Sequence, residues 1–116
     1  MTVKGECICG AVKITAPAPV FVNDCNCSSC ARRGALWAYY PTAEVDIRGG
    51  TMPYVRSDIR EPALAVHHCA TCGVTTHWSR LPGSDDDRFG INARLFDYGT
   101  LDGVEVRHCD GRSWEL

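Results

Sequence analysis

The chain lacks the features that mark an exported, membrane-bound or nucleic-acid-binding protein. Residues 1–6 contain no apolar stretch typical of a secretory signal peptide, so we expect a cytoplasmic protein. No apolar run approaches the roughly 18 residues that a membrane span needs. Lys and Arg number 12 against 14 Asp and Glu, a formal net charge of −2. We therefore expect neither a membrane nor a nucleic acid as a partner.

Long amphipathic helices and internal repeats are also missing from the pattern. Short alternating segments between Gly and Pro residues instead predict a mainly β fold with minimal helix. At 116 residues, the chain is predicted to be a single domain over residues 1–116. The predicted strands are residues 2–6, 11–15, 20–24, 36–40, 44–48, 54–56, 64–68, 74–78, 89–95 and 104–109. A single helical turn is predicted over residues 28–33, ended by Gly34.

The chain is rich in cysteine. Seven of its eight cysteines fall into three clusters, Cys7-x-Cys9, Cys25-x-Cys27-x-x-Cys30 and Cys69-x-x-Cys72. Because nothing marks the chain for export, we expect metal-bound thiolates rather than disulfides. The spacings differ from those of the usual ferredoxin runs, which disfavours an iron–sulfur cluster. Zinc fits better, since a structural zinc takes four protein ligands and a catalytic zinc takes three.

The spacing pairs the first cluster with the third. Cys7 and Cys9 are two residues apart, so on an extended segment both sulfurs point to one face and need a second pair from elsewhere. Cys69 and Cys72 can supply that pair, because a tight turn followed by Gly73 directs backbone N–H groups at the sulfurs. We therefore predict an outer, structural zinc on these four cysteines.

The remaining triad of Cys25, Cys27 and Cys30 is compact enough to hold a second zinc without distant help. Three ligands would leave an open position, so this inner triad is the predicted functional site and the chain is expected to bind two zinc ions. The alternative is a second structural zinc, closed by a fourth ligand. The candidates for that ligand are His67, His68, Asp24 and Cys109.

Three further residues and one segment have predicted structural roles. Cys109 has no partner cysteine near it in sequence, so we expect a small buried hydrophobe. His67 and His68 precede the third cluster and could order the surroundings of the outer zinc. The aromatic segment 36–40 is expected to lie in the core rather than to form a ligand platform.

Taken together, the three clusters resemble those of the glutathione-dependent formaldehyde-activating enzymes, whose relatives include centromere protein V. The similar segments are Gly-Glu-Cys-Ile-Cys-Gly-Ala-Val at 5–12, Cys-Asn-Cys-Ser-Ser-Cys at 25–30 followed by Arg32 and Arg33, and His-Cys-Ala-Thr-Cys-Gly at 68–73. The resemblance covers nearly the whole chain. Segments 34–40, 75–78 and 91–95 look closest to a compact, largely uncharacterised branch of the family.

The resemblance implies a β-tent of small antiparallel sheets joined by zinc. It also implies a structural zinc on the outer cysteines and a catalytic zinc on Cys25, Cys27 and Cys30. The implied reaction joins formaldehyde to glutathione and gives S-(hydroxymethyl)glutathione, which is a carbon–sulfur lyase reaction run in reverse. The partners would then be a small thiol such as glutathione and a small aldehyde.

Few side chains are candidates to assist such chemistry. His77 could shuttle the hydroxyl proton, because the pKa of a histidine lies near working pH, although a packed scaffold histidine is the alternative. Arg32, Arg33 and Arg94 could bind the carboxylates of glutathione, or could be solvated charges.

Two other functions stay open, because a fold and a metal triad do not fix a substrate. One is a binding module in which both zincs are structural and the β surface docks a protein. The other is a redox sensor whose triad oxidises to a disulfide and releases zinc.

Overall fold

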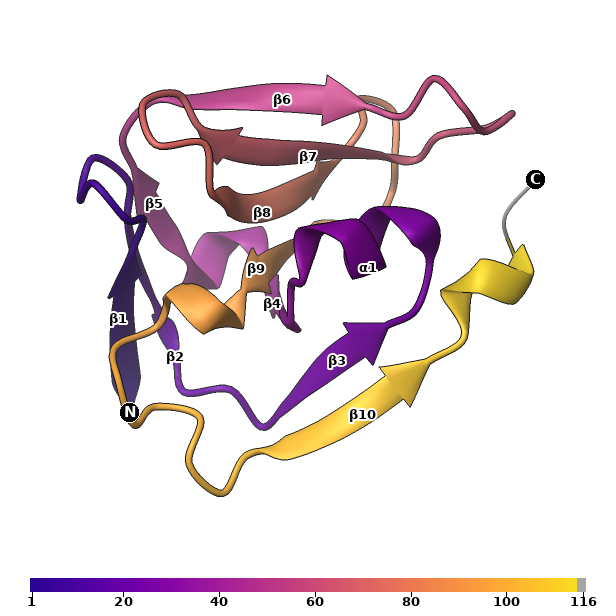
Figure 1. The fold of residues 1–116 in the computed structure, drawn as a ribbon. Helices are drawn as coiled ribbons and strands as arrows, with labels where there is room; N and C mark the ends of the chain where they lie inside the picture. The colour runs from indigo at the N-terminus through magenta and orange to yellow at the C-terminus, as the bar shows by residue number, and fades with distance from the viewer. Residues whose placement is uncertain (115–116) are drawn as a thin grey trace.

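The computed structural model describes residues 1–114 and is mainly β, as predicted (Figure 1). In this part of the chain, ten strands form two sheets, and there is one α-helix with three short 3-10 helices. No helix in it is long and apolar enough to cross a membrane.

The smaller sheet has three antiparallel strands in the order β1 (Thr2–Glu6), β2 (Lys13–Pro17) and β5 (Asp46–Arg48). The predicted hairpin of the first two strands is therefore present, and its loop carries Cys7 and Cys9. Pro17 is the last residue of β2, as expected from a residue that cannot extend the ladder.

The larger sheet has seven strands. Their order is β10 (Glu105–Cys109), β3 (Phe21–Cys25), β4 (Trp37–Pro41), β9 (Arg88–Asn92), β8 (Thr75–Arg80), β7 (Leu64–Cys69) and β6 (Thr51–Val55). All neighbours pair antiparallel except β10 and β3, which run parallel with Cys109 opposite Cys25. Side-chain alternation alone does not reveal strand direction, so this parallel pair could not be predicted from the sequence pattern.

Helix α1 (Ser28–Arg33) occupies the predicted segment. It begins after Cys27, whose sulfur accepts the N–H of Cys30, and ends at Gly34 in the left-handed conformation (φ 64°). The 3-10 helices are η1 (Thr42–Glu44), η2 (Ala93–Leu95) and η3 (Gly111–Trp114). The strand predicted over residues 89–95 is three residues too long. The side chain of Asn92 accepts the N–H of Arg94 and starts η2 instead.

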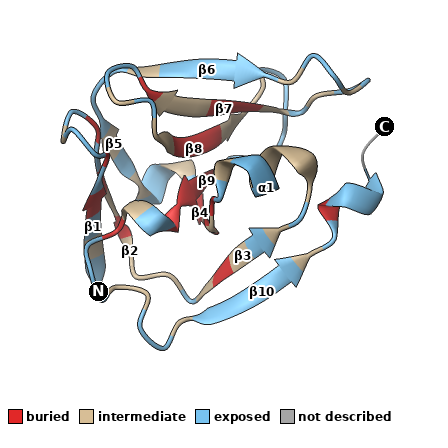
Figure 2. Cartoon of the chain, viewed as in Figure 1, coloured by how far each residue is buried: buried red, intermediate tan, exposed pale blue. Residues whose placement is uncertain are grey.

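The core lies where the inner faces of both sheets meet, and the outer strands β6 and β10 are largely exposed (Figure 2). Ile14 of the smaller sheet and Val22 and Ile91 of the larger one are at most 1% exposed. Within β4, Trp37 and Tyr40 are buried as expected, whereas Tyr39 is only partly covered.

Candidate functional site

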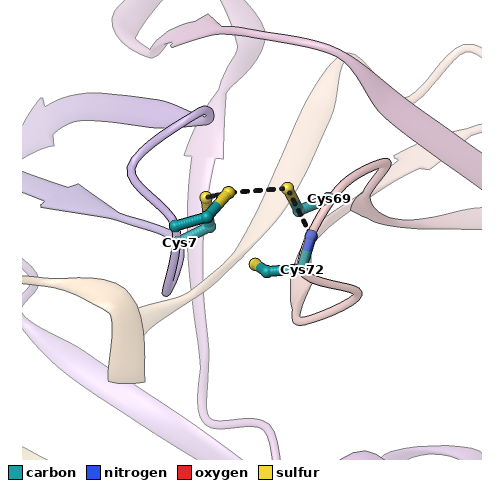
Figure 3. Close-up of side chains that lie close together, drawn as sticks. Cys7, Cys69 and Cys72 are labelled. Carbon is teal, nitrogen blue, oxygen red and sulfur yellow. Dashed lines mark hydrogen bonds between the residues drawn. The ribbon is translucent and has the colours of Figure 1, made fainter.

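The outer cluster joins the two sheets. Cys7 and Cys9 come from the β1–β2 loop, and Cys69 and Cys72 come from the end of β7 and the turn after it. Figure 3 shows the side chains of Cys7, Cys69 and Cys72 facing one another from these two loops. The sulfur–sulfur distances are 3.6 Å from Cys7 to Cys9 and 3.7 Å from Cys9 to Cys69. Four sulfurs at tetrahedral zinc would be about 3.8 Å apart, so this arrangement fits a zinc-sized ion.

Backbone N–H groups also point at these sulfurs, as expected for thiolates. The N–H of Val12 donates to Cys7 Sγ (3.2 Å), and the N–H groups of Thr71 and Cys72 donate to Cys69 Sγ (both 3.4 Å). Backbone N–H groups lower the pKa of the Cys72 thiol to about 6. The turn that aims them needs a positive φ (81°) at Gly73, which a glycine adopts without strain.

The inner cluster lies at the other end of the larger sheet. Cys25 ends β3, Cys27 caps α1 and Cys30 lies inside that helix, with all three sulfurs within 4.8 Å of one another. The N–H of Cys30 donates to Cys27 Sγ (3.2 Å), and the indole N–H of Trp37 donates to Cys30 Sγ (3.3 Å). Burial raises the pKa of the Cys30 thiol, so its thiolate form depends on a nearby cation. Three such sulfurs suit a thiophilic ion such as zinc.

The fourth-ligand candidates do not join this cluster. Within the described residues, the metal-sized group has the three cysteines alone. Both ring nitrogens of His67 face hydroxyl groups, Nδ1 that of Thr51 (3.1 Å) and Nε2 that of Ser79 (3.0 Å). Asp24 forms a 3.5 Å pair with His108 instead.

Cys109 differs from the buried hydrophobe that the sequence suggested. It is only partly buried, lies opposite Cys25 on the parallel strand and lines the same cavity as the triad. The parallel pairing of β10 with β3 places Cys109 beside Cys25, although the two are 84 positions apart in the sequence. A search for partners near Cys109 in the sequence therefore could not find this contact.

A distant segment of the chain supports the loop that carries the inner cluster. Asn26, between two of the cysteines, is held by the segment 109–112. Its side-chain Nδ2 donates to Asp110 Oδ1 (2.9 Å) and its Oδ1 accepts the N–H of Arg112 (3.0 Å). Its own N–H donates to the carbonyl of Cys109 (3.0 Å), and Arg112 Nε donates to its carbonyl (3.2 Å). Four hydrogen bonds thus fix the loop that carries Cys25 and Cys27.

Gly111 brings the backbone directly against the triad. A Cβ atom at this position would lie 2.6 Å from Cys25 Sγ and 3.1 Å from the Cβ of Cys27. Real Cβ atoms do not approach so closely, so the site leaves room for glycine alone at this position. A glycine beside Cys109 was visible in the sequence, but nothing there linked it to the triad.

A cavity of about 720 Å³ opens beside the inner cluster, and all three of its cysteines line it. Four aromatic side chains line it as well, Trp37, Tyr39, Trp78 and Trp114. Its aliphatic lining includes Ile59, Leu64 and Val66, and its charged lining consists of Arg56, Glu61, Arg80 and Arg88. This size lies within the usual range for small-molecule sites.

Tyr39 is a functional candidate that the sequence analysis missed. Asn23 Nδ2 donates to Tyr39 Oη (2.7 Å), so the phenol O–H is left to donate elsewhere. Burial raises the pKa of Tyr39, which keeps the phenol protonated at neutral pH. Such a phenol is a weak acid, so it can donate a proton only to a strongly basic oxygen such as an alkoxide.

His77 lies apart from this cavity, on β8. Its neighbours Trp78 and Arg80 line the cavity, whereas His77 is 6% exposed and stacks on His67 with ring centroids 4.3 Å apart. Its Nδ1 faces the hydroxyl of Thr76 (2.9 Å), and burial lowers its pKa to about 4. These contacts support the scaffold alternative for His77.

The three predicted substrate-binding arginines divide into two groups. Arg32 and Arg33 line a second hollow of about 520 Å³, together with Ser28, Ser29, Tyr54, Arg56 and Asp58. Because Ser29 and Arg56 line both spaces, this hollow adjoins the cavity. Arg94 lies outside both linings, and its Nε donates to the carbonyl of Gly34 (2.6 Å).

Comparison with known proteins agrees with the cysteine pattern. Residues 2–110 match the family model described as glutathione-dependent formaldehyde-activating enzyme. The crystal structure of a Rhodobacter sphaeroides protein is 29% identical in sequence, with a TM-score of 0.70. The match covers 90% of this chain and 98% of that one. The chain therefore belongs to the glutathione-dependent formaldehyde-activating enzyme family.

Proposed function

We propose that the protein is a zinc-dependent enzyme of the carbon–sulfur lyase type that acts on a thiol–aldehyde adduct. The observation that carries the proposal is a cluster of three cysteine sulfurs that opens onto a cavity of about 720 Å³. The outer four cysteines would hold a structural zinc and the inner three a second zinc with an open position. Family membership favours glutathione and formaldehyde as the reactants.

In this proposal, residues of the chain bind and orient the glutathione and protonate the oxygen of the aldehyde. Cys25, Cys27 and Cys30 would hold the zinc ion, which when bound would lower the pKa of a substrate thiol so that its proton passes to water. Arg32 and Arg33 in the adjoining hollow would bind the carboxylates of glutathione. The C–S bond forms as the sulfur attacks the aldehyde carbon, the carbonyl π pair moves to oxygen, and Tyr39 Oη donates a proton to that oxygen. Water returns a proton to Tyr39.

The test follows adduct formation from glutathione and formaldehyde by NMR exchange spectroscopy, with glutathione binding measured separately by calorimetry. We expect zinc-loaded protein to accelerate exchange and Cys25→Ser to abolish the acceleration. Cys109→Ser is the matched control, because Cys109 lines the same cavity outside the three-sulfur cluster. Neither binding nor acceleration by the native protein would refute the proposal, and acceleration that survives Cys25→Ser would place the chemistry elsewhere.

A redox sensor is a second candidate, favoured by the position of Cys109. In-register neighbours on adjacent strands have Cα atoms close enough for a disulfide, and Cys25 and Cys109 are such a pair. A peroxide would take two electrons and two protons from the two thiols and leave a disulfide and water. Mass spectrometry after mild peroxide treatment should detect a Cys25–Cys109 bridge together with metal release, whereas unchanged free thiols would refute this candidate.

The cytoplasmic location, the single domain over residues 1–116 and the binding-module alternative stay predictions. Of that range, residues 115 and 116 lie outside the described part of the chain.

A further inference from the structure

We propose that the aldehyde handled at this site carries an aromatic or branched apolar substituent and is larger than formaldehyde. This inference rests on the proposed function, because it concerns the second reactant at the same cysteine triad. It goes beyond that function by assigning the apolar wall of the cavity to the group attached to the reacting carbon.

The aromatic content of the cavity is the first argument. The chain has three tryptophans, and all three line this one cavity. Tyr39 continues the row, with its ring centroid 6.0 Å from that of Trp78. Formaldehyde adds a single carbon and oxygen to a thiol and needs no such wall. A wall of packed aromatic rings offers a flat apolar surface that suits another ring or a branched chain.

The apolar wall begins directly at the reacting position. Cys30 packs against a buried cluster that contains Trp37, Val66 and Trp78, and Leu64 packs there as well. A carbon bonded to a thiol held at the triad would therefore meet these side chains first. Its substituent would be taken out of water against them, which favours an apolar group.

The carboxylates of glutathione would bind outside the apolar cavity. Glutathione carries two carboxylates, and burying them against Trp and Leu side chains would cost solvation without replacing it. Arg32 and Arg33 line the adjoining hollow, and in the described residues neither forms an ion pair with a carboxylate. Asp58, the one carboxylate in the described lining of that hollow, pairs with Arg56 (2.6 Å), so the two helix arginines outnumber it. The charged ends of the thiol fit that hollow and leave the apolar cavity to the aldehyde.

Two of the three arginines in the cavity lining, Arg80 and Arg88, lie against its aromatic side chains. Asp86 accepts hydrogen bonds from Arg80 (2.7 Å) and from Arg88 (2.8 and 2.9 Å). The guanidinium of Arg80 lies 5.4 Å from the ring centroid of Trp78, and that of Arg88 lies 5.8 Å from that of Tyr39. Both cations are thereby engaged with one carboxylate and stacked on the wall.

Trp114 marks the rim of the cavity. Its side chain lines the cavity yet is 72% exposed, so a large apolar surface stays in contact with water beside the opening. A substituent that reaches the rim would cover it. The reaction keeps the same balance as with formaldehyde: the C–S bond forms, the carbonyl π pair moves to oxygen and that oxygen takes a proton.

The experiment compares stable thioethers that mimic the two adducts. Tryptophan fluorescence and calorimetry measure the binding of S-methylglutathione and S-benzylglutathione to the metal-loaded protein, without any turnover. We expect the benzyl compound to bind about tenfold more tightly or better, because its ring is buried against the aromatic wall. Trp114→Ala and Leu64→Ala should each reduce that ratio. Tyr98→Ala is the control, since Tyr98 is fully exposed and lies outside the cavity lining.

The preference for an apolar substituent should also appear in the reaction rates. Exchange spectroscopy with glutathione should show a larger acceleration over the uncatalysed rate for phenylacetaldehyde than for formaldehyde. Equal or weaker binding of the benzyl compound, with formaldehyde exchange still accelerated, would overturn this inference and leave the proposed function standing. Binding of no glutathione compound, without acceleration of any aldehyde, would overturn both.

Discussion

At the scale of single residues, Gly111 controls the room available to the inner triad. A methyl group at Gly111 would lie 2.6 Å from Cys25 Sγ, so Gly111→Ala must displace either the sulfur or the 109–112 segment. We expect metal affinity at the inner site to fall about 10- to 100-fold, the range typical when the supports of a ligand are disturbed. Titration with Co²⁺, followed by its thiolate absorption bands, measures the change.

The matched control is Gly50→Ala. Gly50 has no atom within 4 Å of an added Cβ, so alanine should leave both metal sites unchanged. The fold of Gly111→Ala should also persist, with the outer site filled as before. An unaltered inner-site spectrum in this variant would contradict the close approach.

His77 should make the stability of the protein depend on pH. Burial lowers its pKa from 6.5 to about 4 in the folded state, so the unfolded chain binds a proton more readily between these values. The stability that depends on neutral His77 is complete above pH 6.5 and is lost as pH falls toward 4. At 1.36 kcal/mol per pKa unit, the loss is up to about 3 kcal/mol.

Urea unfolding at several pH values tests this dependence. His77→Asn can keep a polar contact to Thr76 but cannot gain a proton, so its unfolding free energy should fall less than that of the native protein between pH 6.5 and 4. His108→Asn is the control, since the His108 side chain is 76% exposed. Parallel pH profiles for the native protein and His77→Asn would count against this account. Acid would release metal from both proteins alike, so the difference between their unfolding free energies does not contain that effect.

At the scale of elements, the loop between β3 and α1 depends on the C-terminal segment 109–112. Asp110→Ala removes the acceptor for Asn26 Nδ2, so the loop that carries Cys25 and Cys27 loses a contact that fixes it. We expect weaker inner-site metal binding, roughly 10-fold, with a shifted Co²⁺ spectrum. Asp110→Asn keeps a carbonyl oxygen in place and should restore most of the affinity. Equal losses in both variants would mean that the charge, rather than the hydrogen bond, matters.

The elements that the sequence predicted well are those fixed by local chemistry. Helix α1 occupies the predicted residues and ends at Gly34, a stop signal that is readable from the local sequence, whereas the cap at Cys27 is seen only in the structure. Gly73 likewise marks the turn that directs N–H groups at Cys69. The pairing of β10 with β3 could not be read in this way, because it depends on a contact across 84 positions. That pairing places Cys109, Asp110 and Gly111 beside the triad.

In the candidate site, too, the features set by local sequence were predicted and those set by distant contacts were not. Its cysteines were identified from spacing, since metal ligation imposes a short local geometry. Its aromatic wall was assigned to the core, because a strand alternation does not say which face meets an empty space. Trp37 and Tyr39 share one face of the strand and line the cavity, whereas Tyr40 points to the other face, and only the neighbouring strands decide which face borders a cavity.

At the scale of the whole molecule, the two cysteine sites should differ in what their loss does to folding. The outer site connects a loop of the smaller sheet to a loop of the larger one, across 60 positions between Cys9 and Cys69. Bringing such a loop together costs about 3–4 kcal/mol of chain entropy. A structural zinc contributes on the order of 10–16 kcal/mol, which is comparable to or larger than the roughly 5–15 kcal/mol that stabilises a whole domain.

Cys72→Ser should therefore leave an unfolded or aggregated protein, because it removes one ligand of the zinc that we propose joins the sheets. Cys27→Ser should fold with one zinc per chain, since the inner ligands span only residues 25–30 and their loss releases a short loop. Circular dichroism melting and metal analysis of both purified variants measure the difference. A folded Cys72→Ser protein with native melting behaviour would remove the structural role from the outer site. Collapse of Cys27→Ser to the same extent would mean that both sites hold the fold together, which is the outcome expected of a binding module with two structural zincs.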